Sequence, residues 1–511
     1  MSVGGFENQE SAKQNLDRKP TNQIVLTPGA HVHLMGICGT AMASLAGLLK
    51  DRGFRVTGSD QNVYPPMSTQ LIKLGIQIMQ GYKKENLKEK PDLVIVGNVI
   101  SKSNEEAQEL LKGDIPFTSL PSAMGQLVIE GRHSVVVSGT HGKTTTTSLV
   151  AWVLDTLDVP AGFMIGGIPK NYQMSFRNPQ ADWFVIEGDE YDTAFFDKVP
   201  KFIHYRPRSV ILTSVEFDHA DIYRDLDDVK SAFLRLIGMI PSNGLLVASA
   251  EDANIHDLLV QEADTLAVGG RRVVTFGIES GDYRAVDIQF ADDSKRRLQQ
   301  NVSDDGDDLK TIFTIRREGK KDQVIRTHLI GQYNIKNILA CFALLECLGF
   351  DAQKIADGVL TFQGVKRRQE VIGCPNRVTI IEDFAHHPTA VGQTIATVQA
   401  RYPQARVFSV FEPRSATSRR NVFQSEYAHA FAGAQSVVLA KPFNQAQIPE
   451  DQRLSIDKLV SALVDEGVDA HLFDSVDEIV TFLKKAAVPG DVILIMSNGG
   501  FDGIYEKLLK W

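Results

Sequence analysis

Cysteines are few in this sequence, and long apolar runs are missing. The four cysteines, Cys38, Cys341, Cys347 and Cys374, show neither a C-x-x-C pair nor a disulfide-like spacing, so no disulfide framework is expected. No apolar stretch is long enough to span a bilayer, and residues 1–23 lack the apolar segment typical of a signal peptide. We therefore expect a cytoplasmic protein without a membrane partner.

Excess positive charge is also absent. The chain has 54 Lys and Arg against 63 Asp and Glu, a formal net charge of −9. This balance disfavours a nucleic-acid binder and predicts small-molecule partners, while a local basic site for phosphates stays compatible with it. A hydrophobic fraction of 43% over 511 residues is typical of a globular protein with about three domains.

The alternation of strand and helix patterns predicts an α/β fold with three domains. Residues 1–29 are expected to form a disordered leader and residues 30–125 a Rossmann-like domain. Residues 126–368 are expected to form a central P-loop domain of the ATPase type, and residues 369–511 a second Rossmann-like α/β domain. The cationic run 366–368 follows a glycine at the second boundary, where either a phosphate-binding hinge or a solvated linker is possible.

The most informative stretch lies between a β-branched run and a helical pattern, and reads Gly139-Thr140-His141-Gly142-Lys143-Thr144-Thr145. Glycines let several backbone N–H groups converge on a polyphosphate. Lys143 adds a charge for the β- and γ-phosphates, and Thr144 offers a hydroxyl to Mg²⁺. Val137 stands where the full P-loop pattern has glycine. The stretch predicts an ATP site, and a plain glycine-rich turn is the alternative.

A second strand, turn and helix occurs near the start of the chain. The segment Gly36-Ile37-Cys38-Gly39-Thr40 follows a buried strand pattern and opens a helix, and Asp60 ends the next strand. This layout holds the phosphates and ribose of nucleotides in Rossmann-like folds. The third glycine of G-x-G-x-x-G is missing, so packing of a β-α-β unit explains the glycines about as well. Asn98 follows the third strand.

Acidic residues follow two central strands. Glu187, Asp189, Glu190 and Asp192 come after one strand, and the segment from Ser214 to Asp221, which includes His219, comes after the next. Crowded carboxylates repel one another, and a Mg²⁺ ion would relieve this repulsion. A solvated acidic turn is the alternative for the carboxylates, and a structural role is the alternative for the histidine.

Strands near 378–381, 406–411, 436–439 and 492–496 are expected in the third domain, and three of them end in polar clusters. One cluster contains His386 and His387, but neighbouring residues point in different directions and no third ligand is suitably spaced, so we do not predict zinc. A hairpin with its turn at 304–308 is expected within residues 281–326.

Six motifs occur in one order along the chain: Gly139-Thr-His-Gly-Lys-Thr-Thr145, Glu187-Gly-Asp-Glu-Tyr-Asp192, Glu216-Phe-Asp-His219, Gly331-x-x-Asn334-x-x-Asn337, Lys366-Arg-Arg368 and Asp383-Phe-Ala-His-His-Pro388. Together they resemble the Mur ligases, over about residues 31 to 511. The segments 63–68, 187–197, 204–208, 411–415 and 496–501 resemble the branch that joins UDP-N-acetylmuramate to L-Ala-γ-D-Glu-meso-diaminopimelate in peptidoglycan recycling. The resemblance implies an ATP-dependent, ADP-forming amide ligase.

The resemblance also implies a role for each matching residue. UDP-N-acetylmuramate would contact Gly36, Ile37, Cys38, Gly39, Thr40, Asp60, Asn98 and His141. ATP would contact Gly139, Thr140, His141, Gly142, Lys143, Thr144, Thr145, Asn334, Arg368 and Asp383. Mg²⁺ would be held by Thr144, Glu187 and His219, and Lys143, Glu187 and His219 would be catalytic. The tripeptide would contact His386, His387, Arg414 and Ser497.

Three positions depart from the family pattern. Ser214 replaces an asparagine, Tyr333 replaces a histidine, and the lysine that several members carbamylate is not evident, with Lys230 only nearby. We therefore predict no carbamate. Two other functions remain open: a UDP-N-acetylmuramate–L-alanine ligase, and a P-loop nucleotide-sensing switch without ligase chemistry.

Overall fold

The computed structural model describes residues 18–63, 67–268, 270–290 and 311–511. The chain divides into two compact units, Met1–Glu130 with Asp192–Tyr205, and Gly131–Tyr191 with Arg206–Trp511. Most of the expected leader, the centre of the segment 63–68 and the turn at 304–308 lie outside the described residues. The three-domain limits stay predictions. In the part of the chain that is described, no helix is long and apolar enough to cross a membrane.

The first unit contains a parallel five-stranded sheet in the order β3-β2-β1-β4-β5. Its strands are β1 His31–Met35, β2 Arg55–Asp60, β3 Gln77–Gln80, β4 Leu93–Val96 and β5 Phe117–Ser119. The chain moves outward in opposite directions from β1, so the strand order reverses between β1 and β4. Open sheets of this type bind ligands at such a reversal, beyond the carboxyl ends of the strands. This confirms the predicted Rossmann-like pattern.

The helices of the first unit are α1 Thr40–Asp51, α2 Met67–Lys73, α3 Glu105–Lys112 and α4 Leu120–Ala123. A π-helix, Met124–Ile129, continues α4. The antiparallel pair β10 Asp192–Ala194 and β11 Asp197–Pro200 joins this unit, although it lies far along the chain. Phe195 and Phe196, between those strands, pack against its core beside Phe117.

The second unit contains a ten-stranded sheet in the order β17-β16-β15-β14-β13-β12-β6-β9-β7-β8. Its parallel centre comprises β14 Arg272–Gly277, β13 Leu245–Ser249, β12 Ser209–Leu212, β6 His133–Ser138, β9 Trp183–Gly188 and β7 Gly162–Met164. The remaining strands are β8 Phe176–Arg177, β15 Tyr283–Phe290, β16 Thr311–Arg316 and β17 Gln323–Thr327. β15 and β16 pair antiparallel, which confirms the predicted hairpin strands.

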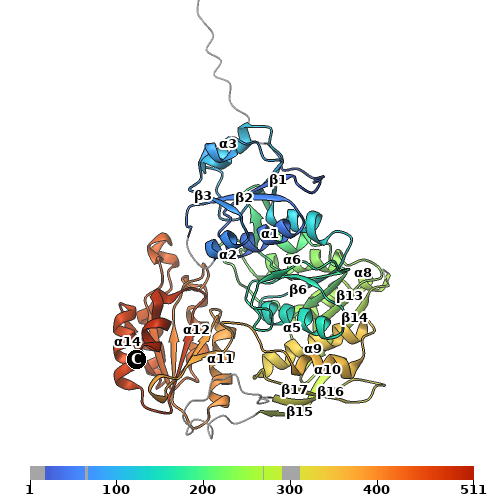
Figure 1. Ribbon diagram of the computed structural model, residues 1–511. Coiled ribbons are helices and arrows are strands. Elements are labelled where there is room, and N and C mark those ends of the chain that lie inside the picture. The colour runs from blue at the N-terminus through green and yellow to red at the C-terminus, as the bar shows by residue number, and fades with distance from the viewer. Residues whose placement is uncertain (1–17, 64–66, 269, 291–310) are drawn as a thin grey trace, which may run out of the picture. The chain divides into compact units, whose positions relative to one another are not determined.

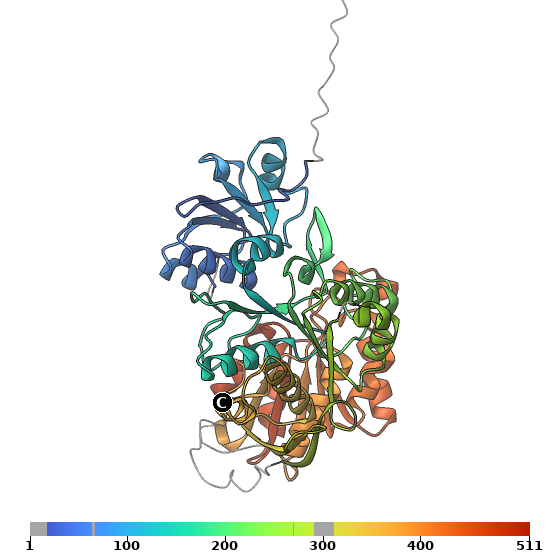
Figure 2. The ribbon, with the colours of Figure 1, turned by 90° about the vertical axis from the view of Figure 1, so that its right-hand side faces the viewer.

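Helices α5 Lys143–Thr156, α9 Gln332–Cys347 and α10 Ala352–Leu360 pack together on one face of this sheet (Figures 1 and 2). Alternate strand residues such as Val135 and Val137 point into their shared core, because successive side chains of a strand face opposite sides. The helices α6 Leu226–Gly238, α7 Ala253–Gln261 and α8 Ala263–Val268 follow β12 and β13. The carboxyl ends of β6, β9 and β12 therefore share one edge of the sheet, which is where the predicted ATP site lies.

The last part of the second unit is a six-stranded sheet in the order β18-β19-β23-β20-β21-β22. Its strands are β18 Glu370–Gly373, β19 Thr379–Asp383, β20 Val407–Phe411, β21 Ser436–Ala440, β22 Asp469–Phe473 and β23 Val492–Met496. Helices α11 Pro388–Arg401, α12 Gln424–Phe431 and α13 Ile456–Asp465 share a core with one face. Helices α14 Val476–Ala486 and α15 Ile504–Leu509 cover the other face (Figure 1). The alternation of Ile380 with Ile381 between the two cores fixes the register.

Candidate active site

The loop between β6 and α5 needs glycine at two positions. Gly139 and Gly142 have φ values of +126° and +82°, in the left-handed region. A Cβ atom at Gly142 would lie 2.6 Å from Asn337 Oδ1, and one at Gly139 would lie 2.7 Å from the carbonyl oxygen of Ser214. The close approach of these segments is therefore possible only without side chains. The geometry supports the P-loop interpretation over a generic turn.

Ser214 holds this loop in place. Its carbonyl oxygen accepts the N–H of Thr140 at 2.9 Å, and its hydroxyl oxygen accepts the N–H of His141 at 3.0 Å. The serine that departs from the family pattern thus fixes the loop through its own hydrogen bonds. Asn334 and Asn337 lie behind the loop: Asn337 donates to Asn334 Oδ1 at 3.3 Å, and Asn334 donates to the carbonyl oxygen of Ile330. The predicted adenine contact of Asn334 stays a prediction.

Lys143 lies folded back against its own loop. Its Nζ donates to the carbonyl oxygen of Gly139 at 2.6 Å and to Glu190 Oε2 at 3.0 Å. Burial lowers the pKa of Lys143, but Glu190 and Asp189 outweigh burial and the pKa rises. The charge of Lys143, together with His219, in turn lowers the pKa of Glu190 although Glu190 is buried. Lys143 is therefore charged and beside the loop that would hold a phosphate.

Glu187 and Thr144 place oxygen atoms together at the start of α5. The Thr144 hydroxyl donates to Glu187 Oε2 at 3.0 Å, and the N–H of Gly166 donates to Glu187 Oε1 at 2.6 Å. Burial and the neighbouring Asp189 raise the pKa of Glu187. A divalent cation would offset the cost of keeping the Glu187 carboxylate charged beside Asp189. Mg²⁺ prefers hard oxygen donors such as these. The residues present therefore fit a Mg²⁺ ion.

His219 lies against Glu190, with Nε2 3.5 Å from Oε1. Burial lowers the pKa of His219, but Glu190 and Asp218 outweigh burial and the pKa rises. The acidic segment is not a solvated turn, because Glu190 is only 3% exposed. Asp192, the fourth carboxylate of the run, instead pairs with Lys198 in the first unit. The predicted metal ligation by His219 stays a prediction.

Arg367 and Arg368 connect the last two parts of the second unit. Arg368 Nη2 donates to Thr144 Oγ1 at 3.3 Å, and its guanidinium lies 4.7 Å from the centre of the Phe384 ring. Arg367 donates to Glu382 at 2.5 Å and to the carbonyl oxygen of Gly499 at 2.6 Å. These two cations do not form a solvated linker. Arg368 reaches the P-loop helix, as an ATP contact requires.

Asp383 accepts hydrogen bonds at the end of β19. Its carboxylate receives the N–H groups of Gln369 and Ala385 at 2.8 and 2.7 Å. Burial raises its pKa, since burial outweighs the nearby Arg368 and these hydrogen bonds. Asp383 thus fixes the turns on both sides of β19. A contact with ATP stays a prediction.

Arg414 lies at the carboxyl end of β20, where the sequence placed it, but it has a local partner. Its Nη1 donates to Glu412 Oε1 at 3.2 Å, and its guanidinium lies 3.7 Å from the centre of the Phe443 ring. Ser497 donates to the other oxygen of Glu412 at 2.6 Å. Pairing with a local acid is the alternative to the predicted peptide contact of Arg414, and that contact stays a prediction. His386 Nδ1 lies 3.0 Å from the carbonyl oxygen of Phe384.

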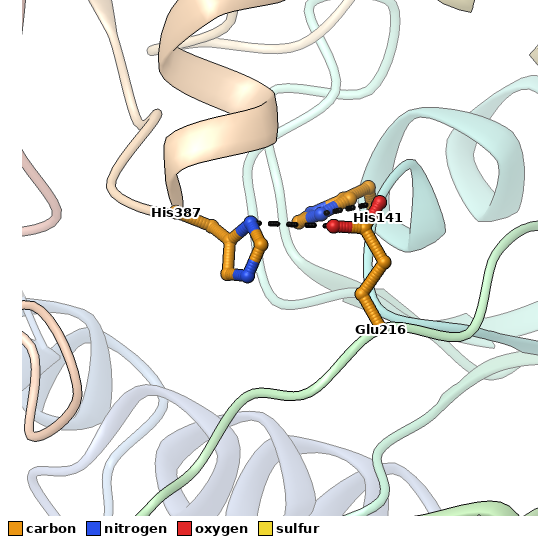
Figure 3. Close-up of side chains that lie close together, drawn as sticks. All are labelled: His141, Glu216 and His387. Carbon is orange, nitrogen blue, oxygen red and sulfur yellow. Dashed lines mark ion pairs between the residues drawn. The ribbon is translucent and has the colours of Figure 1, made fainter. Parts of the chain in front are cut away.

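His387 lies beside His141 and Glu216 (Figure 3). The sequence shows no third ligand suitably spaced for the His-His pair, but the structure brings His141 and Glu216 beside His387. The additional groups come from the P-loop and from the segment after β12, so no local spacing could show them. Glu216 Oε2 also accepts the hydroxyl of Thr389, in α11, at 2.6 Å.

In the first unit, Asp60 supports the turn after β1. Its carboxylate accepts the N–H of Cys38 at 2.9 Å and that of Asn62 at 2.9 Å. Gly36 has a φ of +84°, and Gly39 precedes α1. Burial and the nearby Asp60 raise the pKa of Cys38 to about 11, so the thiol is neutral. Ile37 and Thr40 belong to the same turn region, and Asn98 is exposed after β4.

Sequence reasoning named Glu190 only within an acidic run that could attract Mg²⁺, and it assigned no site role to Glu216 and Thr389. Their partners, Lys143, His219, His141 and His387, are distant in sequence. The acidic motifs that contain Glu190 and Glu216 were noticed, but only the fold shows which basic group each carboxylate meets. Lys230, near the position of the family's modified lysine, pairs with Asp257 at 2.8 Å.

Comparison with known families gives three consecutive matches. Residues 31–132 match the catalytic domain of the Mur ligase family, residues 137–345 match the Mur ligase middle domain, and residues 367–499 match the Mur ligase glutamate ligase domain. Together they span most of the described chain.

Individual relatives match along nearly the whole chain. The UDP-N-acetylmuramate–L-alanyl-γ-D-glutamyl-meso-2,6-diaminoheptandioate ligase of Escherichia coli is 37% identical over 479 residues, 94% of this chain and 97% of that protein. The UDP-N-acetylmuramate–L-alanine ligase of Clostridium tetani is 30% identical over 94% of this chain and 98% of its own. The crystal structure of a murein peptide ligase from Psychrobacter arcticus has 34% identity and a TM-score of 0.69, covering 94% of this chain and 98% of that one.

Proposed function

The chain belongs to the Mur ligase family, and we propose that it joins UDP-N-acetylmuramate to the tripeptide L-Ala-γ-D-Glu-meso-diaminopimelate, consuming ATP, in peptidoglycan recycling. The observation that carries this proposal is the match of 37% identity, over 94% of the chain, to a ligase of that specificity. The match to an L-alanine ligase over the same share of the chain is weaker, at 30%. We place the reaction in the cytoplasm, where ATP is available.

The chemistry requires activation of a carboxylate, because oxide is a poor leaving group. An oxygen of the lactyl carboxylate attacks the γ-phosphorus, the bond from that phosphorus to ADP breaks, and an acyl phosphate forms. The alanine amine of the peptide then attacks the acyl carbon. The carbon–oxygen bond breaks, phosphate leaves with the bonding electrons, and the amine loses a proton as the amide forms.

The residues of the P-loop supply charge and donors for the first step. The charged Lys143 ammonium now binds Glu190 and the carbonyl oxygen of Gly139 in its own loop. When ATP binds, it would leave these partners and bind the phosphates instead, which needs only a short movement of the side chain. Arg368, whose guanidinium reaches Thr144, adds a second cation. Thr144 and Glu187 would hold Mg²⁺, with His219 as a further predicted ligand; when bound, the ion would neutralise charge on the phosphate oxygens.

Recognition of the amine substrate would lie at the carboxyl ends of β19, β20 and β23. Diaminopimelate ends in an amino acid group with one carboxylate and one ammonium, so its site needs a cation and acceptors. Arg414 supplies the cation and Glu412 an acceptor, side by side. A carboxylate of the peptide would bind the Arg414 guanidinium in bidentate fashion.

An assay of ADP release with saturating ATP and sugar tests the proposal. We expect kcat/KM for the tripeptide to exceed that for free L-alanine by on the order of 100-fold or more, because unpaired polar groups penalise the truncated substrate. Mass spectrometry identifies the product. Equal or better use of L-alanine would instead assign the L-alanine ligase activity. ATP hydrolysis independent of both sugar and peptide would indicate the switch.

A variant at Arg414 tests the peptide site itself. Arg414→Ala should raise the KM of the tripeptide by an amount equivalent to about 2–4 kcal/mol and leave those of ATP and sugar little changed. Arg406→Ala is the matched control, because Arg406 precedes β20, also pairs with an acid, Asp491, and also stacks on a phenylalanine. Similar KM values for the tripeptide in the two variants would show that Arg414 does not bind the peptide and only pairs with Glu412.

A further inference from the structure

We propose that His141, Glu216 and His387 form a binding site for a transition-metal ion of the Zn²⁺ class, distinct from the predicted Mg²⁺ ligands. The three side chains offer two imidazole nitrogens and one carboxylate. Their ligand atoms all lie within 4.8 Å of one another (Figure 3). Two nitrogens and a carboxylate are a donor set typical of Zn²⁺, whereas Mg²⁺ prefers oxygen alone.

The distances between the donor atoms fit a small ion between them. Glu216 Oε1 lies 3.6 Å from His141 Nε2, and Glu216 Oε2 lies 3.6 Å from His387 Nδ1. These separations are too long for good hydrogen bonds. They end on different oxygens of Glu216, and one ligand atom from each residue gives a set that lies within 4.8 Å. The edge of a tetrahedral site with metal–ligand distances of about 2.1 Å is about 3.4 Å, so the side chains would draw together around the ion. The two imidazole rings are tilted by 53°, with centroids 4.8 Å apart, so they are not stacked on each other.

Both histidines direct a nitrogen without a good partner toward the carboxylate. His141 Nε2 is shielded from solvent and has no hydrogen-bond partner among the described residues. His387 Nε2 lies 3.2 Å from the carbonyl oxygen of Phe217, and a carbonyl can only accept, so this nitrogen bears the proton. In the neutral ring Nδ1 then presents a lone pair to Glu216, which is also an acceptor. A cation between them resolves this opposition.

Neutral His387 is the form that can bind a metal, and burial favours it. His387 is only 5% exposed, and burial disfavours a charged imidazole. The competing partner of Nδ1 is the backbone N–H of Thr389, and its distance of 3.3 Å makes it a weak one. Metal binding would replace that contact with a stronger one.

Neighbouring groups already orient two of the ligands as they do in metal sites. The Phe217 carbonyl fixes the ring of His387, and the Thr389 hydroxyl fixes the Glu216 carboxylate at 2.6 Å. Such contacts hold a ligand in its binding orientation and raise affinity. The side chains of His141 and Glu216 remain 23% and 29% exposed, although His141 Nε2 itself is shielded, so an ion or a fourth ligand such as water would approach from the side of the carboxylate.

The three ligands come from three separate segments of the second unit. His141 lies in the P-loop, Glu216 follows β12, and His387 precedes α11. A bound ion would therefore connect the ATP loop to the last sheet. Binding should raise the thermal stability of the protein as well as give a direct titration signal.

The test is calorimetric titration of the full-length, chelator-treated protein with Zn²⁺ alone, without nucleotide. We expect one Zn²⁺ per chain, and visible absorption typical of tetrahedral coordination when Co²⁺ replaces it. His141→Asn, Glu216→Gln and His387→Asn should each weaken Zn²⁺ binding by on the order of 100-fold or more. Thr389→Val keeps the side-chain shape and removes one orienting hydroxyl, so it should weaken binding by about 10-fold.

Two controls separate this site from its neighbours. His386→Asn changes the adjacent histidine, whose Nδ1 is directed to the Phe384 carbonyl, and Glu187→Gln changes the predicted Mg²⁺ site. Both should keep the Zn²⁺ affinity of the wild type, and circular dichroism checks that each variant is folded. Unchanged affinity in the folded Glu216→Gln and His387→Asn variants overturns the proposal. So does loss of the ion with Glu187→Gln alone, or no Zn²⁺ binding by the wild type.

Discussion

The turn after β1 and the turn after β6 have the same backbone design and different chemistry. Each joins a buried parallel strand to a helix through glycines with positive φ, Gly36 in the first and Gly139 and Gly142 in the second. In the first turn an acid, Asp60, already accepts the Cys38 N–H. In the second, the cation Lys143 and the Thr144–Glu187 oxygen pair stand at the helix start.

This difference shows that the glycines set the path of the backbone and the side chains around them choose the ligand. A turn that leads into Lys143 suits a polyphosphate, because a charged amine stands at a helix N-terminus, where negative charge is favoured. A turn in which one amide is already held by a carboxylate has one N–H fewer to offer an anion. The family assignment fits this division, with ATP in the second unit and the sugar nucleotide proposed for the first.

The strongest test of the comparison removes the cation. Lys143→Ala should lower kcat by about 10³-fold or more, since the charge that stabilises the transferring phosphoryl group is lost. Binding of UDP-N-acetylmuramate, measured by calorimetry, should stay nearly unchanged. A large loss of sugar affinity in this variant would contradict the assignment of the two ligands to the two turns.

A matched pair of glycine substitutions tests the backbone. Gly142→Ala forces an alanine into φ +82° and against Asn337, which is buried and hydrogen-bonded, and should destabilise the second unit by about 2–4 kcal/mol. Gly39 has a φ of −66°, and its nearest atom to a new Cβ is 3.5 Å away. Gly39→Ala should therefore cost about 1 kcal/mol or less. Differential scanning calorimetry measures the stability of both variants. An equal loss of stability would show that the two glycines do not differ in how strictly the backbone requires them.

A substitution in the predicted Mg²⁺ site should have a smaller effect. Glu187→Gln preserves shape but removes a charge, so the Mg²⁺ concentration needed for half-maximal activity should rise by about 10- to 100-fold. Asp192→Asn is the control, because Asp192 belongs to the same acidic run but pairs with Lys198 in the first unit. An unchanged Mg²⁺ titration in Glu187→Gln would show that Glu187 is not a Mg²⁺ ligand and serves only as a hydrogen-bond acceptor.

The strands β1 and β6, the glycine turns after them and the helices α1 and α5 could be predicted because their sequence signals are local. Runs such as Ser134–Val137 and the glycines after them specify structure within a few residues. The strands β18 and β22 were missed, since edge strands are only partly buried and have weak apolar patterns. The placement of Asp192–Tyr205 in the first unit was also missed, because Phe195 and Phe196 find their core far away in sequence.

The residues of the candidate site show the same difference between local and distant sequence signals. Lys143, Thr144 and Glu187 follow from motifs, and the structure brings the last two into contact. The meeting of His141 with Glu216 and His387 depends on how β6, β12 and the segment before α11 come together. Apolar periodicity predicts each of those elements but not the pairing of their ends.

The smallest effect concerns Asp60, and it decides whether the first turn is a ligand site or only a packed one. Both carboxylate oxygens of Asp60 accept backbone N–H groups, from Cys38 and Asn62. In Asp60→Asn one oxygen becomes an NH₂ group that faces an N–H donor, so one hydrogen bond is lost and the turn shifts. UDP-N-acetylmuramate affinity should then fall by about 10-fold, or about 1.4 kcal/mol, with ATP affinity unchanged. Asp92→Asn is the matched control, because Asp92 accepts the N–H of His31 at the opposite end of β1. If calorimetry finds the same sugar affinity in both variants, the turn after β1 serves packing, and the sugar must be bound elsewhere.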